Sequence, residues 1–192
     1  MEYKTFFKNK IIPEKYREAI LTALSHYPEL KDARIEFRLT TDLKEAYATA
    51  PTFASIFQKP ENRLYRINIL EQASPPMEGA LLKNCTLQCQ VAVIAHELAH
   101  VKQFHERSRL ELFSLLVSYM GKKSKKLIER NADILAIEHG FGSNLYAHAN
   151  YIRSIPGYIQ QHPELDENYL KPHEILIRLL HKAGKFDGEI AI

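Results

Sequence analysis

The sequence is poor in cysteine, and this limits both its redox chemistry and its means of binding metal. Only two cysteines occur among 192 residues, Cys85 and Cys89 in the segment CTLQC. Two cysteines do not make a disulfide framework, and their spacing of four suits packing on one helix face. A zinc site built on cysteine would need more thiolates than these two. We therefore expect reduced thiols and a reducing compartment.

Long apolar runs are also missing. No run approaches the roughly 20 residues needed to cross a bilayer. The nearest, LELFSLLVSYM, is short and contains Glu111. The first residues, MEYKTFFKNK, lack the apolar core of a secretory signal peptide. These absences predict a soluble, cytoplasmic protein.

A strong excess of one charge is absent too. The formal net charge is only +3, and no long basic stripe favours a nucleic-acid partner. The one basic cluster, GKKSKK at residues 121–126, is expected to be a solvated loop rather than a phosphate contact. Hydrophobic residues make up 45% of the chain, enough to bury a real core. Together with the length, this predicts a single domain over residues 1–192.

Apolar patterning places strands early and helices late. Strands are expected in ARIEFRLT (33–40), ASIFQ (54–58) and LYRINIL (64–70), and a short helix in DLKEAYATA (42–50). Helical spacing predicts helices over residues 11–27, 82–106, 110–120, 125–139, 144–155 and 173–183. Gly140 and Gly142 are expected to end the fourth of these. An α+β fold follows, with a small sheet packed on helices.

The segment HELAH carries the strongest chemical signal. His96 and His100 are four residues apart, so on a helix both imidazoles lie on one face and can reach one metal ion. Glu97 is turned by about 100° from His96, so it can miss the ion and still reach a water bound to it. Zinc lowers the pKa of that water, and the carboxylate accepts its proton. A chance occurrence of the motif is the competing interpretation.

A second segment, ERNAD, supplies a third ligand. Glu129 and Asp133 are again four residues apart on a predicted helix, and Glu129 can complete a His2Glu set for Zn²⁺. Asp133 can accept the other N–H of a metal-binding histidine and so fix its tautomer. The alternative, that both residues are exposed helix charges, is weakened by the presence of HELAH.

HELAH followed by ERNAD resembles the gluzincin metallopeptidases, and within them the HtpX and CAAX-prenyl protease group, whose second motif has the form E-x-x-A-D. The resemblance covers about residues 82–140 and, more loosely, the C-terminal helix. It implies that His96, His100 and Glu129 bind zinc and that Glu97 is the catalytic base. It also implies a zincin-like fold, with a small, mostly antiparallel sheet in residues 33–70, metal-binding helices in 82–140 and further helices in 143–183.

One departure from that group bears on the substrate. Its membrane members carry transmembrane helices around the two motifs, whereas this chain has none and is similar to the soluble, minimal members. A peptide or protein substrate is therefore expected, and prenylated or membrane-embedded substrates are not favoured. The substrate itself, and the choice between endopeptidase and aminopeptidase, do not follow from the sequence.

Two other functional classes fit part of the pattern. Two histidines and a carboxylate also bind non-haem iron, but that site does not need a glutamate directly after its first histidine. A carboxylate-bridged di-iron bundle would need a second Glu-x-x-His motif, which the chain lacks. A latent or regulatory binding protein with a zincin fold is the other alternative, and the intact Glu97 argues against it. Zinc-dependent hydrolysis of peptide bonds is the leading hypothesis.

Peptide hydrolysis also needs a hydrogen-bond donor for the developing oxyanion. The HtpX-like group has a His-Pro with an Arg a few residues on. Here HPELDENY has the His-Pro but no Arg at the right distance, whereas PHEILIRL has a His and an Arg five residues later but the reverse order, Pro-His. We expect His173 to be the donor because it opens a helix that also carries Arg178. His162, Tyr169 and Tyr151 are the alternatives, and a purely structural His173 is equally compatible with the sequence.

The strand LYRINIL precedes the metal-binding helix and is expected to lie beside the cleft. Tyr65, Ile67 and Ile69 alternate onto one side of it. As an edge strand it would pair with an extended substrate backbone. An interior strand, with the hydrogen bonds of both edges used, is the alternative.

Overall fold

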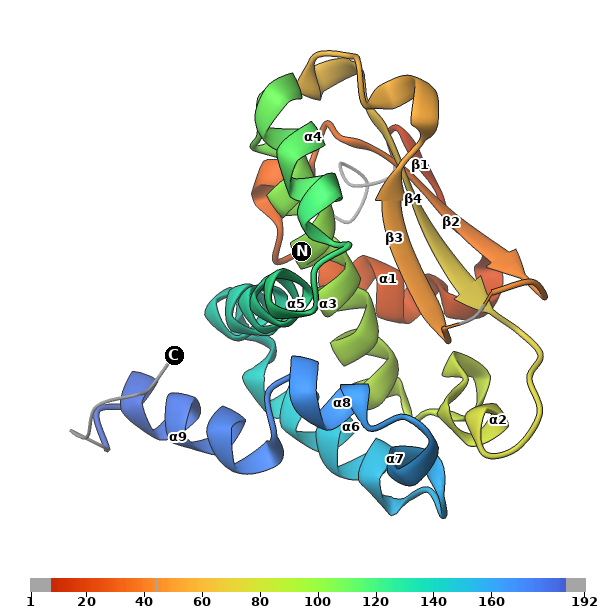
Figure 1. The fold of residues 1–192 in the computed structure, drawn as a ribbon, viewed down its shortest axis with the longest axis vertical. Helices are drawn as coiled ribbons and strands as arrows, with labels where there is room; N and C mark the ends of the chain where they lie inside the picture. The colour runs from red at the N-terminus through yellow and green to blue at the C-terminus, as the bar shows by residue number, and fades with distance from the viewer. Residues whose placement is uncertain (1–7, 44, 186–192) are drawn as a thin grey trace.

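The computed structural model describes residues 8–43 and 45–185, which form a small sheet beside a larger group of helices (Figure 1). The predicted α+β class is confirmed, because the strands of the described residues end at Leu70 and most of the helices follow. Helix α3 (Leu87–His105) runs through the middle of the molecule and packs on both groups.

The sheet is mixed, which corrects the expectation of a mostly antiparallel one. Its order is β1 (Lys10–Ile11), β2 (Arg34–Thr40), β4 (Leu64–Leu70) and β3 (Tyr47–Pro51). β1 and β4 both run parallel to β2, and β3 runs antiparallel to β4. Parallel neighbours need a crossover connection. Helix α1 (Arg17–Leu24) provides it between β1 and β2, and the chain forms β3 at the sheet edge before it returns as β4.

Two segments of the N-terminal half differ from their predicted structure. DLKEAYATA, predicted as a helix, contains most of β3, because pairing with β4 and packing on α3 outweigh its local helix propensity. ASIFQ, predicted as a strand, begins inside the 3-10 turn Phe53–Ser55 and forms no strand. The hydroxyl of Ser55 accepts the Leu64 N–H at 2.8 Å, so this turn is held by a side chain rather than by a strand partner.

The predicted strand LYRINIL forms β4, but it is not an edge. β2 pairs with one side of it and β3 with the other, so the expectation of a free edge there is wrong. The predicted alternation is confirmed, since Tyr65, Ile67 and Ile69 are fully buried. Among the described strands, the edge nearest the HELAH helix belongs to β3.

The helices occupy most of the predicted positions. In addition to α1 and α3 they are α2 (Met77–Ala80), α4 (Arg109–Ser118), α5 (Lys122–Ala136), α6 (Gly142–Ser154), α7 (Tyr158–Gln161), α8 (Glu164–Asn168) and α9 (Pro172–Lys182). α7 and α8 lie between two predicted helices, in residues for which the apolar pattern predicts no element. The basic cluster at 121–126, expected to be a loop, forms the beginning of α5. No helix of the described ranges combines the length and the apolar character needed to cross a bilayer.

Helix α3 begins later than predicted because Thr86 caps it. The Thr86 hydroxyl accepts the Cys89 N–H at 3.3 Å, and the preceding residues Leu82–Asn84 form a separate 3-10 turn. Cys85 therefore lies outside the helix that contains Cys89, although both thiols are free and buried, as packing residues should be.

Two glycines shape the connection between α5 and α6. Gly140 has φ of +95°, a conformation that glycine adopts without steric cost, and it breaks the helix as predicted. Gly142 begins α6 instead of ending a helix. A Cβ atom on Gly142 would lie 2.5 Å from Cδ2 of Leu179, so the glycine lets α9 pack closely on α6.

Helix α3 is buried on all sides along its central part, where every residue from Val91 to Val101 is buried. A helix that is apolar around its whole circumference belongs in the interior of a protein. The HELAH side chains are therefore presented by a packed core element, and only one further helix is needed to enclose them.

Candidate metal centre

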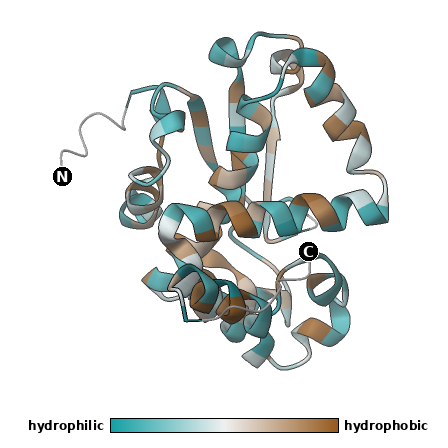
Figure 2. Cartoon of the chain, turned by 90° about the vertical axis from the view of Figure 1, so that its left-hand side faces the viewer, coloured by the Kyte–Doolittle hydropathy of each residue, from teal (hydrophilic) through white to brown (hydrophobic). Residues whose placement is uncertain are grey.

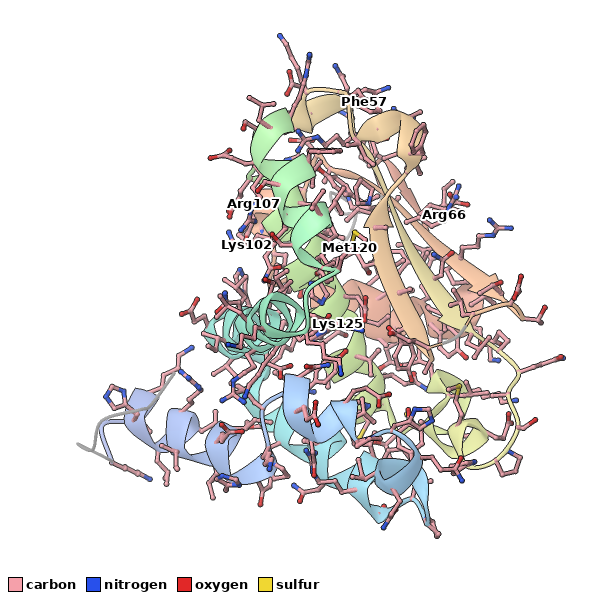
Figure 3. All side chains as sticks on the ribbon, viewed as in Figure 1. Phe57, Arg66, Lys102, Arg107, Met120 and Lys125 are labelled. Atoms are coloured by element: carbon pink, nitrogen blue, oxygen red, sulfur yellow. The ribbon has the colours of Figure 1, made fainter. Side chains whose placement is uncertain are left out.

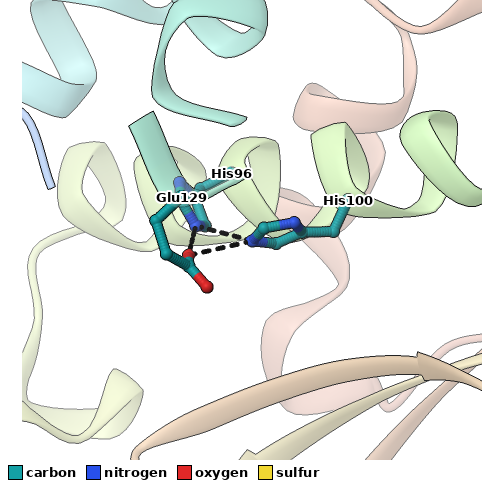
Figure 4. Close-up of side chains that lie close together, drawn as sticks. All are labelled: His96, His100 and Glu129. Carbon is teal, nitrogen blue, oxygen red and sulfur yellow. Dashed lines mark hydrogen bonds and ion pairs between the residues drawn. The ribbon is translucent and has the colours of Figure 1, made fainter. Parts of the chain in front are cut away.

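Three buried side chains from two helices converge on one point. His96 and His100 come from α3 and Glu129 from α5, and one ligand atom from each lies within 4.8 Å of the others (Figure 4). His96 Nε2 is 3.2 Å from Glu129 Oε2. His100 Nε2 is 3.1 Å from the same oxygen and 3.1 Å from His96 Nε2. The HELAH and ERNAD segments, each identified by an i, i+4 spacing, thus lie next to each other in the structure.

These donors fit a zinc ion in both chemistry and spacing. Two imidazoles and one carboxylate are a ligand set that catalytic zinc uses. Bonds of about 2.0–2.1 Å at tetrahedral angles place zinc ligands about 3.3 Å apart, close to the separations found between the three atoms. His96 Nε2 and His100 Nε2 also lie close to each other, as two ligands of one cation would.

Electrostatics hold Glu129 in its charged form. Burial alone would raise the pKa of this carboxyl, but hydrogen bonds from His100 and His96 outweigh it and keep the pKa well below its ordinary value. Burial alone would lower the pKa of His96, and its hydrogen bonds to Asp133 and Glu129 raise it instead. The site thus holds an anionic carboxylate that is stabilised by positive charge close to it, and a metal cation could supply that charge.

The other nitrogen of each histidine has a partner of its own. His96 Nδ1 is 2.9 Å from Asp133 Oδ1, and the second carboxylate oxygen of Asp133 accepts the Leu170 N–H at 2.8 Å. His100 Nδ1 is 3.1 Å from the hydroxyl of Tyr119, which follows α4. Partners of this kind fix the tautomer and orientation of a metal-binding imidazole. The sequence gives no sign of Tyr119 as a partner, because no spacing rule links it to HELAH.

Glu97 points toward the sheet instead of toward the three ligand atoms. The Thr49 hydroxyl of β3 donates to Glu97 Oε2 at 2.6 Å. This hydrogen bond fixes one carboxylate oxygen beside the histidine pair and leaves the other for a second partner. Thr49 was assigned to a helix from the sequence, so its role as a partner of Glu97 could not be foreseen.

A cavity of about 150 Å³ opens next to His96 and Glu97. Its wall is mostly apolar and includes Ala92, Val93, Leu145, Ala149, Ile152 and Leu170. Lys125 and Glu45 form an ion pair of 3.0 Å at the same cavity. His148 also lines it, and burial lowers the pKa of His148 to about 4, so this ring is neutral.

The structure separates the four residues considered as oxyanion donors. His173 is exposed on the first turn of α9 and does not line the cavity. Tyr151 donates to the backbone oxygens of Gly79 and Asn84, away from the cavity wall. His162 and Tyr169 both line the cavity, and the Tyr169 ring lies 5.5 Å from that of His96.

Comparison with known proteins adds one finding. Residues 77–152, which contain both HELAH and ERNAD, match the sequence model of Peptidase family M48. The matched segment runs from α2 into α6 and carries all three convergent ligand residues. No curated protein and no solved structure matches the chain. The family match supports a metallopeptidase, with peptides or proteins as substrates, and the His2Glu cluster supplies a possible metal site.

Proposed function

We propose that this protein is a zinc-dependent metallopeptidase of the gluzincin type. In this proposal His96, His100 and Glu129 hold the metal, Glu97 is the general base, and Asp133 orients His96. The observation that carries it is the convergence of the three ligand atoms within 4.8 Å, two of them on the helix whose next residue after His96 is Glu97. The family match over residues 77–152 supports the same chemistry.

Two measurements on the purified full-length protein test this function. Metal analysis should find about one zinc per chain, as one His2Glu site requires. A peptide-library digest should then give cleavage products whose formation stops when a chelator removes the metal. A protein that contains stoichiometric iron instead, or that cleaves no member of the library when fully loaded with zinc, would contradict the proposal.

In this mechanism the chain's own residues position the proton transfers. A bound zinc ion supplies Lewis-acid chemistry, which lowers the pKa of water and polarises a carbonyl. Glu97 accepts the proton of the attacking water and passes it to the leaving amine, as a carboxylate of suitable position can do. Thr49 holds the carboxylate in place during both transfers, and its hydrogen bond leaves one oxygen of Glu97 free to act.

We assign the substrate backbone to β3 rather than to β4. β3 ends the sheet on the side of α3, and among the described strands its outer edge has no partner. An extended peptide could add to this edge, with alternate side chains pointing toward the metal centre and away from it. Thr49 lies on β3, so a peptide paired there would run past Glu97.

Tyr169 is the oxyanion donor that the geometry supports best. Burial raises the pKa of its phenol well above the ordinary value, and the nearby carboxylates of Glu129 and Glu97 add to the rise, so the phenol keeps its proton. We expect Tyr169→Phe to lower kcat on the order of 100-fold with little change in KM, because the hydrogen bond forms only in the transition state.

The matched control for this prediction is His173→Ala. His173 is exposed and outside the cavity, so this variant should retain wild-type kcat. Steady-state kinetics on one cleaved peptide, with zinc content measured for each protein, compare the two. A large loss of kcat in His173→Ala, together with a wild-type kcat in Tyr169→Phe, would show that His173 is the oxyanion donor instead.

The cavity beside Glu97 is expected to receive a substrate side chain next to the scissile bond. Its volume of about 150 Å³ equals that of an engineered apolar cavity that binds benzene, so a large apolar or aromatic side chain fits. Ile152→Ala should enlarge the cavity and shift kcat/KM toward bulkier side chains by about tenfold relative to leucine, the effect of a few methylenes.

Ile155→Ala is the matched control, since Ile155 is a partly buried isoleucine close by that does not line the cavity. It should leave the ratio of kcat/KM values for bulky and small side chains unchanged. Because the prediction concerns a ratio, a general loss of stability or metal does not mimic it. An unchanged ratio in Ile152→Ala would show that the cavity does not select the substrate.

A further inference from the structure

Helix α4 carries apolar side chains on the side that faces away from the core. Leu110, Phe113, Val117 and Met120 are 83%, 57%, 51% and 88% exposed, and we call them the apolar arc. They are spaced by three or four residues, so Leu110, Phe113 and Val117 lie along one side of α4, and Met120 follows just after its end. Leu112, on another side, is the buried residue of α4. Apolar side chains gathered in this way usually mark a contact surface.

Three lysines follow the apolar arc directly in the chain. Lys122, Lys123 and Lys126 are exposed at the beginning of α5, and within the described ranges none of them takes part in an ion pair. Lys125 differs, because it turns to Glu45 at the cavity. We call the three unpaired residues the lysine cluster. Its charge is therefore not neutralised by the protein itself.

The apolar arc and the lysine cluster meet at one projecting corner. Figure 2 shows the turn between α4 and α5 at the outer margin of the molecule, with apolar residues along the helix that leads to it. Figure 3 labels Met120 near the end of α4, from which the chain enters α5. The exposed acid of α4, Glu111, is engaged in the capping box with Ser108 at the far end of the helix. The apolar arc and the lysine cluster themselves contain no acidic residue, and the exposed acid Glu45, named above, is paired with Lys125.

We propose that this corner docks the protein onto an anionic lipid surface. Apolar side chains of one helix side enter the interface between headgroups and acyl chains, while nearby lysines contact the anionic headgroups. The uncompensated positive charge favours this partner over a second copy of the chain, which would bring three more lysines to the contact. Docking would place the Lys125–Glu45 side of the cavity close to the lipid surface.

Flotation of the zinc-loaded, full-length protein with vesicles of phosphatidylcholine, with and without phosphatidylglycerol, tests the proposal. Binding is expected only with phosphatidylglycerol, and it should weaken as added salt shortens the Debye length. Each lysine near an anionic surface contributes about 1 kcal/mol, or about fivefold in partitioning. Replacing Lys122, Lys123 and Lys126 with Gln should therefore reduce partitioning on the order of 100-fold.

Insertion of the apolar arc is tested separately. Val117→Ser combined with Met120→Ser should reduce partitioning at least about tenfold, since burying one such side chain contributes about 1.5–3 kcal/mol. The apolar control combines Ile11→Ser with Leu176→Ser, two exposed positions outside the corner. The charge control replaces Lys31, Arg34 and Arg38, three exposed cations elsewhere, with Gln.

Both controls should bind like the wild type and have unchanged circular dichroism spectra. The proposal is overturned if the wild type does not float with phosphatidylglycerol vesicles, or if the controls lose as much binding as the corner variants. It is also overturned if the apolar variant alone converts a dimer to a monomer in sedimentation equilibrium without affecting flotation, because the corner would then join two copies. None of these outcomes depends on peptidase activity.

Discussion

Replacing Glu97 with Gln is expected to abolish peptide cleavage while the fold and the metal remain. The amide has the size of the carboxylate, and its oxygen can still accept the Thr49 hydroxyl that now contacts Oε2 at 2.6 Å. It cannot accept a proton from water at neutral pH, so the general-base contribution of about 10²–10⁴ in rate is lost. The measurement is kcat/KM on a peptide that the wild type cleaves, with zinc quantified in both proteins.

Glu106→Gln is the matched control for charge, because it removes one carboxylate directly after the same helix, where Glu106 is exposed. This variant should cleave the peptide at the wild-type rate. Near-normal cleavage by Glu97→Gln would remove the base role. Loss of zinc from Glu97→Gln would show instead that the residue acts in the metal site, where the structure gives it no ligand position.

The convergence of the three candidate metal ligands is the part of the site that the sequence could predict, because its geometry is mainly local. His96 and His100 share a helix, and a spacing of four fixes their side of it whatever surrounds them. Glu129 and Asp133 repeat the spacing on a second helix. A single packing contact, α3 on α5, then brings the two pairs together, and Asp133 meets the free nitrogen of His96 as expected.

The residues of the site that could not be predicted from the sequence reach it through contacts between distant parts of the chain. Thr49 reaches Glu97 only because residues 47–51 form a strand, and that strand exists through pairing with β4 rather than through local propensity. Tyr119 reaches His100 because of the turn between α4 and α5. Neither contact leaves a periodic signal in the sequence.

The direction and order of the strands could not be read from the sequence for the same reason. The alternation in residues 34–40 and 64–70 shows which side of each strand is buried, but it is identical for parallel and antiparallel neighbours. The position of β4 between β2 and β3 depends on a connection through 3-10 turns at 53–55 and 60–62. This order moves the candidate substrate edge from β4 to β3.

Replacing His100 with Ala should have the second large effect, on metal binding itself. Loss of a residue that only orients a metal ligand costs about 10- to 100-fold in metal affinity, so loss of a ligand should exceed 100-fold. His100 Nε2 also lies 3.1 Å from the Glu129 carboxylate, which would then keep only His96 as a nearby partner of this kind. The loss of a ligand and the loss of a hydrogen-bond partner of Glu129 both weaken metal binding at the His2Glu cluster.

The loss should appear as a loss of zinc-dependent stability, independent of any activity assay. At a free zinc concentration of 100 times the wild-type Kd, binding stabilises the folded state by about 2.7 kcal/mol. A Kd raised more than 100-fold leaves less than about 0.5 kcal/mol of that stabilisation. Chemical denaturation of His100→Ala with and without zinc should therefore give nearly coincident curves, whereas the two wild-type curves should be well separated.

His105→Ala is the control, because His105 ends the same helix and its Nδ1 lies 3.2 Å from the Tyr65 hydroxyl, outside the ligand cluster. It should keep the full zinc-dependent shift, although it loses one hydrogen bond in both conditions. If His100→Ala instead retained stoichiometric zinc and the wild-type shift, the metal would be bound elsewhere. The convergence of His96, His100 and Glu129 would then be a buried hydrogen-bond network without a metal.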